Sequence, residues 1–188
     1  MAIEVFVADE QSDRPVDPER WATLARQVLG AEGVRGEAEL SVLFIDEGAI
    51  AALNERFLGH EGPTDVLSFP IEDDPVGGGR YPDAGGPGPG WASPDEGALP
   101  MLLGDVVICP AVAHRQAPEH AGTYDNEIAL LLVHGILHLL GMDHEEEAEA
   151  EEMERREQEL LGAFHRRAEL PKEPLEAEPV SEGGPTSR

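Results

Sequence analysis

Residues 125–144 read DNEIALLLVHGILHLLGMDH and carry three histidines in an otherwise apolar run. From about Asp125 to Leu140 the run is apolar on every side, which predicts a long helix buried at the centre of the molecule. Gly141 fits the position just after a helix, where a left-handed residue ends it. We therefore expect this helix and the turn after it to organise the fold.

His134 and His138 are four positions apart, so both rings project from the same face of the predicted helix. Gly141 lets the chain fold back and bring His144 to the same point. Three neutral imidazoles and a water give the four-coordinate arrangement of a catalytic zinc site. Without a metal, each buried ring would need a polar partner to offset its desolvation. The spacing therefore predicts one Zn²⁺ ion per chain, bound by His134, His138 and His144.

Carboxylate side chains flank the third histidine on both sides. A histidine that binds a metal through one ring nitrogen usually donates its other N–H to a carboxylate or carbonyl group, which fixes the ring. Asp143 and Glu145 are the candidates for this role at the predicted site.

The histidine spacing is also that of the metzincin proteases, H-E-x-x-H-x-x-G-x-x-H. Those enzymes use the glutamate after the first histidine as a general base, and this chain has Gly135 there. Without that carboxylate, peptide hydrolysis loses its proton acceptor, which disfavours a peptidase. A metal that lowers the pKa of a bound water still predicts hydrolytic chemistry.

Around the central helix, strand and helix patterns alternate. Strands are expected at residues 2–9, 37–46, 64–71 and 101–110. Helices are expected at 18–32, 47–59, 125–140 and 145–164, with a shorter one from 110 that Pro118 must end or kink. Asp17 and Asp46 are the expected N-caps of the first two helices. The pattern predicts an α+β domain with about four strands and about five helices, and with the metal site on the central buried helix and the following turn.

Two segments depart from this pattern. Residues from 73 to about 98 are dominated by Gly, Pro and Asp, which predicts a flexible surface insert. Residues 166–188 are rich in Pro and Glu, which predicts a disordered acidic tail. Residues 1–165, including the insert, are expected to form a single domain.

The 188-residue chain has a formal net charge of −26 and one cysteine. Acidity alone argues against nucleic-acid binding, although a bound cation inverts the local sign. The lone Cys109 excludes an internal disulfide framework and a Cys-based zinc finger. No apolar run approaches the roughly 20 residues of a membrane span, and the start lacks a basic leader. A soluble, cytoplasmic protein with no membrane partner is expected.

The segment HGILHLLGMDH (134–144) closely resembles the H-G-x-L-H-L-x-G-[YM]-D-H signature of the YbeY family of bacterial endoribonucleases, also called rRNA maturation factors. Two further stretches agree with that family in order and approximate spacing. LNERFLGHEGPTDVLSFPIE (53–72) resembles its L-N-x-x-[YF] and T-D-V-L-S-F segment, and LLGDVVICP (102–110) resembles its L-G-D-I-x-I strand. The resemblance covers about residues 3–164, apart from the insert.

The resemblance implies a mixed four-stranded sheet surrounded by helices, with zinc held by His134, His138 and His144. It also implies a single-strand-specific endoribonuclease that matures the 3′ end of small-subunit rRNA and takes part in ribosome quality control. The implied partners are single-stranded ribosomal RNA, the small ribosomal subunit and its assembly factors.

One position departs from the family pattern. Members commonly carry an arginine after the [YF] of L-N-x-x-[YF], and this chain has Leu58 there. Such an arginine is a natural candidate to bind a phosphate or offset charge that develops on it. Arg56, His60 and Arg115 are the candidates to bind substrate in its place. The alternative for the two arginines is a solvated helix position.

Thr64, Asp65 and Ser68 have two interpretations. They line the catalytic cleft, or they only start a strand, with Asp65 capping a neighbouring turn. Both interpretations stay open at this point.

Three functions also stay open. The first is a zinc-dependent hydrolase that cleaves single-stranded RNA. The second is a ribosome-assembly binding protein whose metal is structural, and the third is a metzincin-like peptidase, which Gly135 disfavours. An open fourth coordination position favours catalysis, whereas a fourth protein ligand favours a structural metal.

Overall fold

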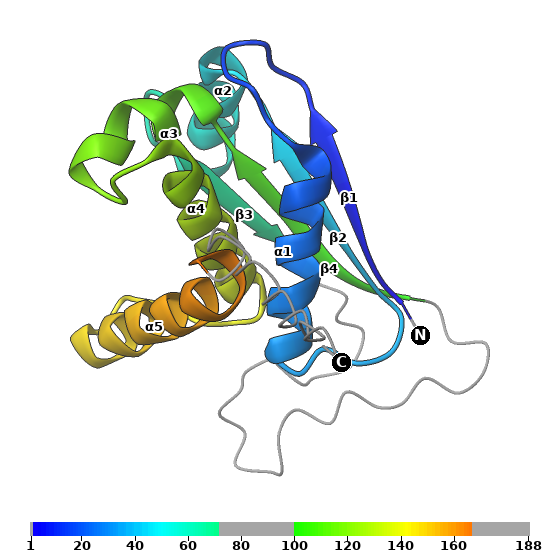
Figure 1. Ribbon diagram of the computed structural model, residues 1–188. Helices are drawn as coiled ribbons and strands as arrows, with labels where there is room; N and C mark the ends of the chain where they lie inside the picture. Colours follow the sequence, from blue (N-terminus) through cyan, green and yellow to red (C-terminus); the bar gives the residue numbers. More distant parts are fainter. Residues whose placement is uncertain (1, 72–99, 167–188) are drawn as a thin grey trace, which may run out of the picture.

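The computed structural model describes residues 2–71 and 100–166 (Figure 1). The expected insert at 73–98 lies outside the described residues, as does the expected tail apart from Arg166. Within the described part of the chain, no helix is both long and apolar enough to cross a membrane.

Four strands form one sheet in the order β1-β2-β4-β3. β1 (Ile3–Asp9) pairs parallel with β2 (Ala38–Phe44), and β2 pairs parallel with β4 (Met101–Ile108). β3 (Val66–Pro70) pairs antiparallel with β4 at the other edge. The parallel β1–β2 pair needs a crossover, which α1 (Pro18–Ala31) provides. The predicted α+β fold with a mixed four-stranded sheet is confirmed.

The two faces of the sheet are covered differently. Alternate residues of β2 face the larger core, which also contains buried residues of α1 and α4 (Tyr124–Leu139). The opposite face carries a smaller cluster that includes Ile50 of α2 (Glu47–Leu58) and Leu67 of β3. Figure 1 shows α1 and α4 side by side over the first face. The larger core therefore lies between the sheet and these two helices.

α4 is the central helix of the described residues. Thr123 caps its N-terminus by accepting a hydrogen bond from the backbone N–H of Asn126 at 3.2 Å. The helix packs on α1, β3 and β4, and ten of its residues are buried. The predicted central, buried helix is confirmed.

Two further helices flank α4 (Figure 1). α3 (Pro110–Gln116) gives way to a 3₁₀ turn (Ala117–Glu119) that contains Pro118, as the sequence predicted. α5 (Glu147–Leu160) starts with a capping box between Glu146 and Glu149 and continues as a π-helical turn (Leu161–Arg166). These elements leave a partly open side of α4, and His134 and His138 lie there.

Candidate metal centre

The three predicted histidines meet at the C-terminal end of α4. His134 and His138 are one turn apart, and their ring centroids are 4.5 Å apart. Gly141 has φ +96°, and the N–H groups of Gly141 and Met142 donate to the carbonyl groups of His138 and Leu137. This left-handed ending turns the chain back. The His144 ring then lies 5.6 Å from that of His134 and 5.0 Å from that of His138.

The donor atoms of this triad suit a small cation. One nitrogen from each ring lies within 4.8 Å of the others, and the Nε2 atoms of His134 and His138 are 3.0 Å apart. A tetrahedral zinc with bonds of about 2.05 Å places its nitrogen ligands about 3.3 Å apart. The exposed His144 ring offers its nitrogen within 4.8 Å of the other two ligand atoms, which is close to this spacing. The three residues could hold a metal ion, and their spacing is compatible with zinc.

A carboxylate from another helix orients the first ring. Glu157 of α5 is 8% exposed, and its Oε1 lies 2.6 Å from Nδ1 of His134. A carboxylate oxygen accepts, so Nδ1–H donates to it and the lone pair of His134 stays on Nε2, which faces His138. Glu157 thus fixes the tautomer and rotation that metal binding requires.

The surroundings of His138 favour its neutral form. Burial lowers the pKa of His138 from its ordinary value, and the neighbouring His134 and His144 rings lower it further. A neutral imidazole is the form that ligates a metal. The surroundings of His138 therefore favour the form that binds a cation.

Asp143 and Glu145 were predicted to accept the N–H of a ligand ring, and the structure gives them different environments. Oδ1 of Asp143 accepts from the backbone N–H of His144 at 2.7 Å, which steadies the loop backbone. Glu145 is exposed at the start of the acidic segment. The carboxylate that contacts a ligand ring is instead that of Glu157, which the sequence analysis did not predict. Its signal was present, because Glu157 falls on the same helical face as the buried Met153 and Leu160.

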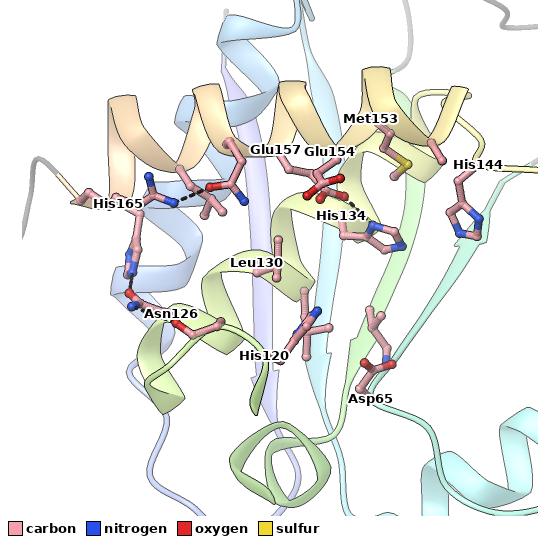
Figure 2. Close-up of a pocket in the computed structure, with 17 residues that line it drawn as sticks. Asp65, His120, Asn126, Leu130, His134, His144, Met153, Glu154, Glu157 and His165 are labelled. Carbon is pink, nitrogen blue, oxygen red and sulfur yellow. Dashed lines mark hydrogen bonds and ion pairs between the residues drawn. The ribbon is translucent and has the colours of Figure 1, made fainter. Parts of the chain in front are cut away.

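An open cleft of about 580 Å³ extends from the triad between α4 and α5 (Figure 2). His134 and His144 line one part of it, and Asn126 and His165 line another. Apolar side chains form much of the remaining wall, among them Leu130, Leu131, Met153 and Leu161. A cleft of this size beside a candidate metal centre has room for a small portion of a polymer substrate.

Of the three candidates near β3, Asp65 lines this cleft. Its Oδ1 accepts from the backbone N–H of Val66 at 2.8 Å, and its Oδ2 accepts from Nε2 of Gln116 at 2.7 Å. Thr64 donates to Asp65 at 3.3 Å and does not line the cleft. Ser68 donates to the carbonyl oxygen of Gly135 at 3.1 Å, which ties β3 to α4. Asp65 thus both faces the cleft and holds a turn.

The candidates for substrate binding lie outside the cleft lining. The guanidinium of Arg56 lies 5.2 Å from the ring centroid of Phe57, and Arg115 forms an ion pair with Glu47. His60 and Leu58 are exposed. The cation that does line the cleft, among the described residues, is Arg166. Substrate binding by Arg56, His60 or Arg115 therefore stays a prediction.

The packing of Gly135 bears on the peptidase alternative. A Cβ at this position would lie 2.7 Å from Cγ1 of Val106 and 3.2 Å from Oγ of Ser68. Glycine is needed here because α4 approaches the sheet so closely. A side chain at residue 135 would point into the sheet, away from the histidines. The position that carries the general base in metzincins is therefore closed in this fold.

Fold and site together define a class: an α+β protein with a histidine triad suited to a catalytic metal, open to a cleft. The model of the family described as Endoribonuclease YbeY matches residues 6–165, and the chain belongs to this family. A relative from Frankia casuarinae named Endoribonuclease YbeY is 46% identical over 85% of this chain and 74% of its own length. A second relative with this name, from Thermobifida fusca, is 44% identical over 89% of this chain and 97% of its own length.

A solution structure from Thermotoga maritima shares the fold. It covers 87% of this chain and 93% of its own, with a TM-score of 0.50 and 22% sequence identity. At that identity the likeness concerns the fold alone.

Proposed function

We propose that this protein is a zinc-dependent endoribonuclease that cleaves single-stranded RNA, with one zinc ion bound by His134, His138 and His144. The observation that carries the proposal is the meeting of three imidazoles, with donor atoms within 4.8 Å of one another, beside an open cleft. The family gives the reaction class, endonucleolytic cleavage of RNA. Residues 1–165 form the catalytic domain in this proposal.

The charge of the cleft supports a need for a bound cation. Three carboxylates line it, from Asp65, Glu154 and Glu157, against the one guanidinium of Arg166, which leaves a formal charge of −2 with neutral histidines. An RNA phosphate entering this cleft meets net repulsion. A divalent cation on the triad would bring the formal charge of the cleft lining from −2 to zero and would place positive charge at the triad itself. Metal binding and RNA binding are therefore coupled in this proposal.

When bound, zinc would supply a Lewis acid for the phosphate and would acidify a water. The side chains of this chain do the rest. Glu157 holds His134 in the ligating tautomer, and Asp143 holds the backbone that presents His144. Asp65 faces the bound RNA from the wall formed by the start of β3. Arg56, His60 and Arg115 stay candidates for contacts with RNA outside the cleft.

The cellular substrate in this proposal is ribosomal RNA, at the 3′ end of the small-subunit molecule, and the protein also acts in ribosome quality control. The small ribosomal subunit and its assembly factors are the proposed partners, in the cytoplasm. These assignments follow the resemblance of the HGILHLLGMDH and TDVLSF segments to the family.

The test compares three preparations on one single-stranded RNA and on its duplex: zinc-loaded protein, metal-free protein and His138→Ala. Cleavage of the single strand by the zinc-loaded protein alone is the expected result. His114→Ala serves as the matched control, because His114 is an exposed histidine outside the cleft lining. Equal cleavage by all preparations points to a contaminating nuclease and refutes the proposal.

The same variants separate catalysis from a purely structural metal. Co-sedimentation with small ribosomal subunits that survives His138→Ala, together with no RNA cleavage by the zinc-loaded protein, would favour the ribosome-assembly binding protein. Metal analysis of the wild-type protein tests the identity of the ion, and one zinc per chain is expected.

A further inference from the structure

We propose that His120 transfers a proton to the leaving oxygen of the scissile phosphodiester, and that Glu127 positions it. The inference rests on the proposed RNA hydrolysis and names the proton donor for it. His120 follows the 3₁₀ turn after α3, and Glu127 lies on α4. Neither residue belongs to the histidine triad.

Glu127 is a buried carboxylate with a full set of hydrogen bonds. It is 0% exposed, and it lies seven residues before His134, on the same face of α4. Nε2 of Gln116 donates to Oε1 at 2.8 Å, and the backbone N–H of Ala121 donates to Oε2 at 3.2 Å. Nδ1 of His120 lies 2.8 Å from Oε1 and 3.0 Å from Oε2. Buried acids are rare unless they are paired in this way.

These contacts decide which nitrogen of His120 faces the cleft. Glu127 already accepts from two N–H groups, so it acts as a carboxylate, and Nδ1–H of His120 donates to it. The two ring nitrogens point in nearly opposite directions, so Nε2 is directed away from Glu127. The side chain of His120 is 56% exposed, although its partner is fully buried. A fixed ring thus presents one nitrogen to solvent.

His120 lines the same cleft as His134 and His144. Figure 2 shows His120 and Asp65 on the side of the cleft away from α5, with His134 between them and Glu157. Gln116 links this wall together, because its Nε2 donates both to Asp65 at 2.7 Å and to Glu127 at 2.8 Å. A phosphodiester held at the triad therefore shares its cleft with an oriented imidazole. This arrangement suits general acid catalysis.

The proposed step is hydrolysis, and water is the only reactant besides the RNA. A water oxygen bonds to phosphorus and releases one proton to solvent. The bond between phosphorus and the leaving oxygen breaks, and its electron pair goes to that oxygen. The imidazolium of His120 gives its Nε2 proton to the same oxygen, so the products are a phosphomonoester and an alcohol. A proton from solvent then restores the imidazolium.

The contacts of Glu127 also anchor the chain after α3, and a purely structural pair must be distinguished from a proton donor. His120→Asn makes this distinction, because the Asn amide places an N–H close to the position of Nδ1 and has no titratable proton. His114→Asn is the matched control, an exposed histidine on α3 outside the cleft lining.

The experiment uses zinc-loaded full-length protein and a single-stranded RNA whose cleavage position has been mapped. A second RNA carries sulfur in place of the leaving oxygen, because a thiolate departs without a proton. We expect His120→Asn to lower kcat on the oxygen substrate by about 10²-fold or more, with KM nearly unchanged. The sulfur substrate is expected to be cleaved at nearly the wild-type rate, and His114→Asn is expected to cleave both normally.

Each other outcome is decisive. No cleavage by the zinc-loaded wild-type protein overturns both the proposed function and this inference. Normal cleavage of the oxygen substrate by His120→Asn overturns the role of His120 alone, and so does equal loss on both substrates, which indicates a structural role. Nitrogen-15 NMR of the metal-free wild-type protein gives a readout independent of activity. Neutral His120 is expected to carry its proton on Nδ1, and a proton on Nε2 instead would refute the positioning by Glu127.

Discussion

Replacing Glu157 by Gln tests whether the carboxylate on α5 prepares the metal site. The Oε1 of Glu157 lies 2.6 Å from Nδ1 of His134, and the side chain is 10% exposed. A glutamine of the same size keeps an oxygen near Nδ1–H but loses the negative charge. It also offers an NH₂ group, which favours the wrong tautomer of His134. Zinc affinity is therefore expected to fall while the fold is kept.

The size of the effect follows from the contact. Loss of the group that orients a ligating histidine typically costs 10–100-fold in metal affinity. A short, largely buried contact belongs at the upper end, so we expect about 100-fold, or about 2.7 kcal/mol. An exposed ion pair would contribute at most about 1 kcal/mol.

The assay is competition for zinc between the protein and a chromogenic chelator at pH 7. Glu154→Gln is the matched control, because Glu154 lines the same cleft and makes no hydrogen bond to the three rings among the described residues. Circular dichroism of the metal-free variants checks that both fold. Equal weakening in the two variants would show that only cleft charge matters, and unchanged affinity in Glu157→Gln would refute the orienting role.

Three more predictions test packing, ionisation and metal linkage. Gly135→Ala places a Cβ 2.7 Å from Cγ1 of Val106, so urea unfolding should show a loss of about 1–3 kcal/mol, whereas Gly30→Ala, with open space around its Cβ, should be neutral or slightly stabilising. Burial raises the pKa of Tyr124 to about 12, so absorbance titration should show a late phenol ionisation that Tyr124→Phe lacks. The stability from neutral Tyr124 is present below the unfolded pKa of about 10 and lost as pH rises toward the folded value. Chelation of zinc should lower the melting temperature of the wild-type protein by an amount equivalent to about 2.7 kcal/mol at 100 times Kd, and leave His138→Ala unchanged.

The sequence predicts those features that short-range geometry controls. The spacing of His134 and His138 on a helix, with Gly141 after it, is enough to bring three rings together within eleven residues. Asp17 and Asp46 cap α1 and α2 as expected, because a cap acts on N–H groups three residues away. The strand positions follow from runs of apolar residues in the same local way.

The role of Gly135 could be predicted only in part from the sequence. From the sequence, glycine at this position removes the general base of a metzincin. Only the structure gives the reason for it, because the contact is between α4 and the strands that carry Val106 and Ser68. The distance between a helix and a sheet depends on all the side chains between them, and no local pattern specifies it.

The tertiary structure alone decided which groups surround the triad. From the sequence, the carboxylates next to His144 were predicted to orient a ligand ring. The carboxylate that contacts a ring is that of Glu157, twenty-three residues from His134. The pairing of His120 with buried Glu127 depends likewise on how the turn after α3 lies against α4. Spacing along a helix fixes which side chains share a face, so the three histidine ligands could be predicted from the sequence. The crossing of separate helices over the sheet is set by packing of the whole core, and it alone determines which acid meets which histidine.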